Sequence, residues 1–135
     1  MSSLVDTVEI DIIAETQSTY MKNYATLLKY YSDRNGEKLH VAKAIRPFIE
    51  GMLRSHFPGH FMVEEWLGNF IDKIRNAQPG DGLFHLNDDL SEITNINDYS
   101  KKYHHDQNPN ADNEYISEDE LHGYVKRTLR LVGIN

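Results

Sequence analysis

Apolar residues recur at helical spacing in five successive stretches of this 135-residue chain, and this pattern limits its fold more than any other feature of the sequence. An amphipathic helix repeats its buried side chains at i, i+3, i+4 and i+7, which is the spacing found in each stretch. The stretches are, in order, 13–31, 41–53, 63–74, 87–103 and 117–132. Short breaks rich in glycine, proline and asparagine separate them. The sequence therefore predicts an all-α five-helix bundle, a single helical domain over residues 1–135.

Local signals refine the helix limits. The third stretch starts at Val63 and passes through Trp66, so we expect Trp66 and the eight tyrosines to lie in the core and between helices. The last stretch opens on Ser117 and Glu120, a capping box, with neighbouring apolar residues placed as a hydrophobic staple. Pro47 lies inside the second stretch and predicts either a kinked helix or a helix whose first turn holds the proline.

The segment Val8–Ile12 does not fit the helical period. It alternates apolar and acidic residues at period 2, which is typical of a half-buried strand. Either residues 1–12 include the irregular start of the first helix, or this segment is one short N-terminal strand that pairs with another chain. The helix is the favoured interpretation, because a lone strand has no ladder partner in a helical chain.

Composition excludes several classes of function. The chain has no cysteine, so it has no disulfide, thiolate metal site or cysteine nucleophile. Its net charge of −7 opposes nucleic-acid binding by this chain alone. No signal peptide or membrane-length apolar run is evident, so we expect a soluble, cytoplasmic protein without a membrane partner. Phosphate-binding and dinucleotide-binding glycine motifs are absent, and no cofactor is expected.

The loop before the last helix offers a weak metal alternative. Asp106, Asn108, Asn110 and Asp112 place oxygen side chains at alternate positions, as an EF-hand calcium loop does. Both registers of that motif fail, however, since one puts Ala111 at the glycine position and the other starts on a proline. Asn and Asp also favour turns, because their side chains bond to nearby backbone. The turn is the favoured interpretation, and no metal is assigned.

Ribonuclease chemistry is a second alternative. Arg34 and His40 match the Arg-x4–6-His spacing of small HEPN-like ribonucleases, which act without a metal, and the adjacent His104 and His105 are further acid–base candidates. The Arg34–His40 window spans an Asn-Gly helix break, whereas the chemistry needs both side chains fixed on one surface. No catalytic residue is assigned on this evidence.

Four segments carry a resemblance to a known family. They are Ala44–Gly59, with Arg-Pro-Phe-Ile-Glu and Phe-Pro-Gly; Glu65–Gly68; Asn97–His105, with Tyr-Ser and His-His; and Glu120–Gly133. Together they span about residues 40–133. The succession resembles the C-terminal region of large bacterial AAA/ABC-type ATPases, the class that includes anticodon-nuclease and phage-defence proteins.

The resemblance implies an interaction module and not an enzyme in its own right, because the nucleotide-binding core of that family is missing here. The chain would then be a fragment, an excised domain or a detached gene product. Its expected partner is a protein, either an ATPase subunit or a second copy. Within it we expect Asn97, Tyr99, Ser100, His104 and His105 to form a polar cluster that fixes the fourth helix to the loop before the fifth.

Overall fold

The computed structural model describes residues 4–134 and consists of helices joined by loops. The five α-helices, which pack together, are α1 (Leu4–Asp33), α2 (Lys38–His56), α3 (Leu67–Arg75), α4 (Leu90–Ser100) and α5 (Glu118–Arg130). Three short 3-10 helices, η1 (Phe84–Asp89), η2 (Lys101–Tyr103) and η3 (Ala111–Asn113), lie between them. Residues 4–134 contain no strand. The predicted all-α five-helix bundle is confirmed.

The backbone of Val8–Ile12 is helical and lies within α1. The favoured interpretation is thus confirmed, and the alternative of a short strand is wrong. Five alternating residues carry too little information to separate the two periods, and a strand would need a ladder partner. Residues 1–3 of the predicted extension lie outside the described part of the chain.

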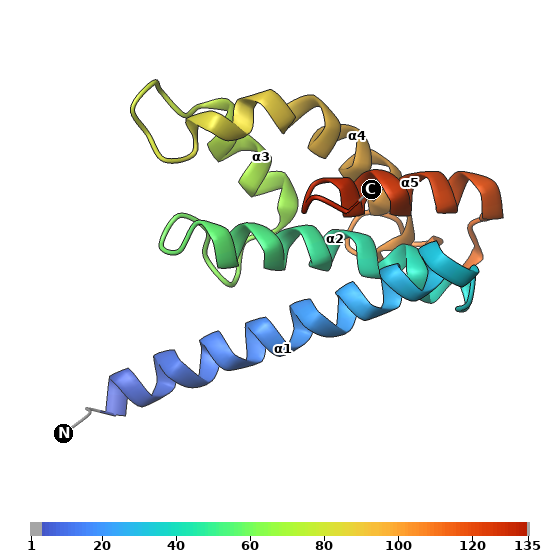
Figure 1. Ribbon diagram of the computed structural model, residues 1–135, viewed down its shortest axis with the longest axis horizontal. Helices are drawn as coiled ribbons and strands as arrows, with labels where there is room; N and C mark the ends of the chain where they lie inside the picture. The colour runs from blue at the N-terminus through green and yellow to red at the C-terminus, as the bar shows by residue number, and fades with distance from the viewer. Residues whose placement is uncertain (1–3, 135) are drawn as a thin grey trace.

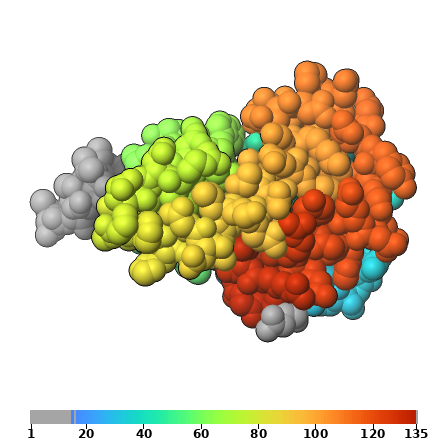
Figure 2. Space-filling model, turned by 90° about the horizontal axis from the view of Figure 1, so that it is seen from above, coloured from blue at the N-terminus to red at the C-terminus, as the bar shows by residue number. Residues whose placement is uncertain are grey.

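Helix α2 is at the centre of the molecule. Helix α1 runs along one side of it, while α3, α4 and α5 lie on the other (Figure 1). Viewed from above, α3, η1, α4, the segment after it and α5 form a continuous surface (Figure 2). Helix α2 contributes the largest share of the buried core side chains, among them Val41, Ile45, Phe48, Ile49 and Leu53. A helix contacted on several sides must bury more than one stripe, which explains why nearly every residue from Val41 to Leu53 is buried.

The ends of α2 follow from its local sequence. Gly36, at φ +144°, lies in the break before it, and the Glu37 carboxylate then accepts the Leu39 and His40 N–H groups at 3.2 and 3.1 Å. The helix runs on through Pro47, so the predicted first-turn position of this proline is wrong. Pro47 has no N–H, and the Lys43 carbonyl therefore lacks its usual partner four residues on.

Helix α3 starts four residues later than predicted. Val63 and Trp66 precede it and are 58% and 53% exposed, so the prediction that Trp66 lies in the core is wrong. The physical reason is Arg54, which binds the carbonyls of this loop and keeps its backbone out of a helix. The Asn69 side chain then accepts the Trp66 N–H at 2.9 Å and starts the helix.

Tyrosines follow the prediction with one exception. The core includes three of them, Tyr30, Tyr99 and Tyr103. Four others are partly buried against the core: Tyr20, Tyr24, Tyr31 and Tyr124. The exception is Tyr115, which is 83% exposed in the loop before α5.

Helix α5 begins as its capping pattern predicts. The Ser117 hydroxyl accepts the Glu120 N–H at 3.3 Å, and Ile116 and Leu121 are buried on either side of the cap. The predicted fourth helix is divided, because η1 precedes α4 and η2 follows it. Among the described residues, no helix is both long enough and apolar enough to cross a membrane.

Candidate functional site

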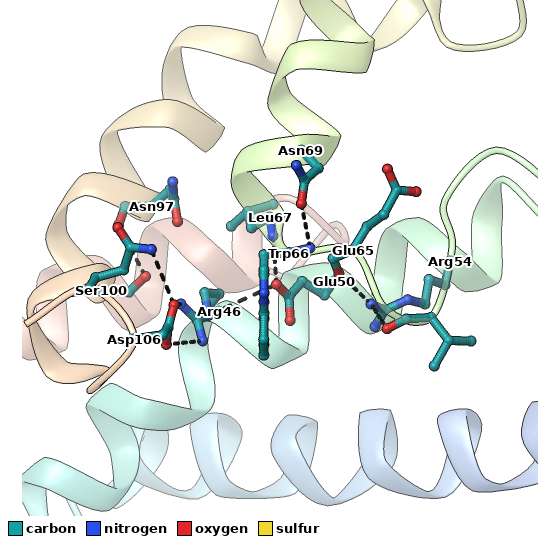
Figure 3. A network of polar contacts seen from close by, with 12 residues as sticks. Arg46, Glu50, Arg54, Glu65, Trp66, Leu67, Asn69, Asn97, Ser100 and Asp106 are labelled. Carbon is teal, nitrogen blue, oxygen red and sulfur yellow. Dashed lines mark hydrogen bonds and ion pairs between the residues drawn. The ribbon is translucent and has the colours of Figure 1, made fainter.

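An ion pair between the buried Arg46 and the partly exposed Asp106 joins α2 to the loop after η2. Arg46 is only 6% exposed, and its two terminal nitrogens bind the two carboxylate oxygens of Asp106 at 2.9 and 3.0 Å (Figure 3). This two-point geometry fixes both side chains, because the planar guanidinium matches the carboxylate fork. The hydrogen bonds from Arg46 lower the pKa of Asp106 to about 2. The pair fastens a loop 60 residues away in sequence to the central helix.

Glu50 extends this network by one helical turn. It is 4% exposed, and its carboxylate accepts the Leu67 N–H at 2.6 Å, at the first residue of α3. The Arg46 Nε lies 3.9 Å from the same carboxylate oxygen. Burial raises the pKa of Glu50 against the opposing effect of that backbone hydrogen bond and of Arg46. Glu50 therefore positions the start of α3, where a carboxylate also complements the helix dipole.

Trp66 covers the network from outside. Its ring lies over the Arg46 guanidinium, 4.7 Å from the carbon to the ring centroid, and in Figure 3 it is drawn across the line that joins Arg46 to Glu50. The face of an indole attracts a cation, and the contact removes one side of the guanidinium from water. Arg46, Glu50 and Asp106 with Trp66 form what we call the charge network.

Loop 57–66 is fixed by a second arginine. Arg54 donates to the carbonyls of Met62, Val63 and Glu65, the last two at 2.9 and 2.8 Å. Its guanidinium also lies over the Phe70 ring at 5.1 Å. Glu65 in turn accepts the Met62 N–H at 2.8 Å and binds Lys73 at 2.6 Å. Hydrogen bonds from Arg54 and to Glu65 thus fix the backbone of this loop.

The residues of the predicted polar cluster separate into two groups. Tyr99 and Ser100 are buried at the end of α4, where Tyr99 stacks on Tyr124 with ring centroids 3.9 Å apart and the Ser100 hydroxyl donates to the Asn97 carbonyl at 3.3 Å. Burial raises the pKa of Tyr99. His105 instead lies at the surface, with its Nε2 3.0 Å from Asp112 in η3.

His104 faces the charge network. Burial, and then the positive charge of Arg46, lower its pKa to about 4, so the imidazole is neutral near pH 7. Its Nε2 is buried without a hydrogen-bond partner among the described residues. His104 and His105 therefore point to different surroundings, as adjacent residues do when the chain turns between them.

The other candidate catalytic residues are not brought together. The Arg34 guanidinium binds Asp119 of α5 at 2.8 Å. His40 is exposed in the first turn of α2, and no hydrogen bond or ion pair of the described residues joins it to Arg34. The structure thus assigns Arg34 to an ion pair between helices.

Three of the four metal candidates bind other residues through their side chains. Asp106 binds Arg46, Asp112 binds Lys43 and His105, and the Asn108 side chain contacts the Lys102 carbonyl and Glu114. The Asn108 oxygen also accepts the Asn110 N–H at 3.1 Å, the local turn expected of asparagine. Among the side chains that the structure describes, no group of three or more His, Asp or Glu residues is placed to hold a metal ion.

Sequence reasoning missed the central members of the charge network. Arg46 and Glu50 are four residues apart in α2 and each follows a core isoleucine. Two opposite charges at i and i+4 inside an apolar stretch are the signal that could have found them, because such residues are rarely buried unless paired. No protein-family model, curated protein or solved structure matches this chain.

Proposed function

We propose that this chain is a non-catalytic helical interaction module, related to the C-terminal part of bacterial defence-type AAA/ABC ATPases. The supporting observation is that the four segments on which the resemblance depends contact one another. Glu50 of the first segment binds the Leu67 N–H of the second. Tyr99 of the third stacks on Tyr124 of the fourth. Arg46 of the first binds Asp106, which directly follows the third.

These contacts give the shared residues a framework role. Arg46 and Glu50 are buried charges with partners on other elements, and such paired charges restrict how the helices can pack. His104 fits the same role, because a half-buried neutral imidazole beside Arg46 fills space in the network. A module of this kind acts through its outer surface, and its partner would be an ATPase subunit.

Affinity capture tests the proposal. The tagged full chain would be used to capture partners from a lysate of its host, followed by mass spectrometry of the eluted proteins. We expect an ATPase in stoichiometric amount, and we expect His105→Ala to lower stability or capture without changing any reaction rate. A folded chain that elutes alone, or only with a second copy, would contradict the ATPase relationship.

A cleavage assay separates this proposal from the ribonuclease alternative. The purified chain would be incubated with a mixed-sequence RNA with and without a chelator. We expect no cleavage in either case. Cleavage that survives the chelator and disappears in both His40→Ala and His105→Ala would replace the interaction module with a metal-independent nuclease.

A further inference from the structure

Loop 57–66 gathers exposed apolar side chains into one patch. Met62, Val63 and Trp66 are 51%, 58% and 53% exposed, within five residues of chain. Among the side chains whose exposure the structure describes, the other large exposed apolar ones are Met21, Phe84 and Tyr115, which come from separate elements. Single exposed apolar residues need no explanation, but a cluster marks a surface of interaction. We call Met62, Val63 and Trp66 the loop patch.

The backbone beneath the loop patch is already ordered. Arg54 donates to the carbonyls of Met62 and Val63, and Asn69 accepts the Trp66 N–H. Trp66 is further fixed by its contact with Arg46. A partner would therefore not have to order this loop, and binding loses less free energy when the contact surface is pre-organised. Tryptophan is also among the residues that contribute most at interfaces.

A groove continues the loop patch between α1 and α2. It has a volume of about 260 Å³ and is lined by Glu15, Thr19 and Tyr20 of α1, Pro47, Gly51 and Arg54 of α2, and Val63 of the loop. Val63 is thus shared by the patch and the groove. On the α2 side, Gly51 is in close contact with Tyr20, and Pro47 contributes an apolar ring to the groove. The size suits one or two apolar side chains.

The charges at this surface that have no partner in the described chain are negative. Glu15 in the groove and Glu64 in the loop are exposed, and neither makes an ion pair among the described residues. Arg54, the cation of the groove, is bound to three backbone carbonyls, and Lys73 is bound to Glu65. The net charge of −7 has the same sign. Electrostatic complementarity therefore favours a cationic partner.

We infer that the loop patch and the α1–α2 groove bind a basic segment of a partner protein, which inserts apolar side chains into the groove and places lysine or arginine beside Glu15 and Glu64. This inference deepens the proposed function by naming the surface of the module and the chemistry of its partner. Trp66 would be covered in the complex.

Trp66 is the only tryptophan of the chain, so its emission reports occupancy of this surface directly. The full chain would be titrated with two tryptophan-free peptides of leucine at helical spacing, one with lysine and one with glutamate at the remaining positions. We expect a saturable blue shift with the lysine peptide alone. The affinity should fall as salt rises, because the Debye length shortens from about 10 Å at 0.1 M to about 3 Å at 1 M.

Matched variants locate the contact. Val63→Asp should lower the affinity for the lysine peptide by about tenfold or more, and a tenfold change is equivalent to about 1.4 kcal/mol. Tyr115→Asp, at a more exposed site in another loop, should leave the affinity unchanged. Glu15→Gln with Glu64→Gln should reduce both the affinity and its salt dependence. Circular dichroism and thermal melting would confirm that each variant is folded.

Several results would overturn the inference. They are no saturable shift, equal binding of both peptides, or full binding by Val63→Asp. A blue shift that appears with rising protein concentration alone would assign the surface to a second copy of the chain. Repeating the affinity capture with Val63→Asp keeps the two proposals distinguishable. An ATPase that is still captured would leave the interaction module standing and move its docking surface elsewhere.

Discussion

At the scale of single residues, Arg46 has the largest predicted effect on stability. Arg46→Ala would leave Glu50 buried without its cation and would remove the two hydrogen bonds to Asp106. It would also remove the cation that lies against the Trp66 ring. Breaking a buried pair by removing one partner costs about 3–5 kcal/mol. We expect a loss near the lower end, because the Asp106 side chain is 35% exposed and regains water. Urea unfolding at pH 7 measures this free energy.

The matched control for Arg46 is Arg75→Ala. Arg75 binds Asp72 at 3.0 Å, but both side chains are more than half exposed. Exposed pairs contribute about 0–1 kcal/mol, so the control should lose less than about 1 kcal/mol. Equal losses for the two variants would mean that the charge network does not stabilise the fold.

The lowered pKa of His104 predicts how the stability of the fold depends on pH. Its pKa in the folded chain is about 4, below the ordinary value of 6.5, so the unfolded chain binds more protons between these values. Stability should therefore decrease as pH falls from about 6.5 to about 4. His104→Gln should flatten this part of the profile in urea midpoints measured at several pH values. Asp106, whose lowered pKa is about 2, acts in a more acidic window, where its stabilisation is lost as pH falls through that value.

A His104→Gln profile that stays as steep as that of the unmodified chain between about pH 6.5 and pH 4 would contradict this assignment.

At the scale of helices, the contact of α1 with α2 depends on Gly51. A Cβ at this position would lie 3.1 Å from the Tyr20 Cβ, tighter than ordinary contacts. Gly51→Ala gains about 1 kcal/mol of helix propensity but crowds a packed interface, which typically costs about 1–3 kcal/mol. We expect net destabilisation in thermal melts.

Gly123 in α5 provides a control by the same substitution. A Cβ there has no neighbour within 4 Å, so Gly123→Ala keeps the propensity gain and should raise stability by about 0.5–1 kcal/mol. Opposite signs for the two variants are the expected result. Stabilisation by both would show that α1 can move away from α2 without loss.

The sequence predicts helices well where one local pattern decides them, and the start of α5 at Ser117 is an example. It fails at α3, because Val63 and Trp66 fall at helical spacing while Arg54 holds their backbone as a loop. The charge network was missed for the same reason. Arg46 and Asp106 are 60 residues apart, and no local pattern signals their pairing.

At the scale of the whole molecule, the charge network connects segments that are distant in sequence into one unit. One core cluster includes buried residues from all five helices. Trp66 lies on the outside of that unit but rests on Arg46, whose partners come from α2 and the loop after η2. Loss of the core should therefore remove the surroundings of Trp66 at the same time.

We therefore expect a single cooperative unfolding transition. The urea midpoint from Trp66 emission should coincide with the midpoint from far-ultraviolet circular dichroism, since coincident probes are the test of two-state behaviour. In Arg46→Ala both midpoints should move down together. In Tyr115→Asp neither should move, because that side chain is exposed and outside the core. A Trp66 transition at lower urea than the loss of helix would mean that loop 57–66 detaches first. The loop patch would then not be pre-organised, and a partner would have to order it on binding.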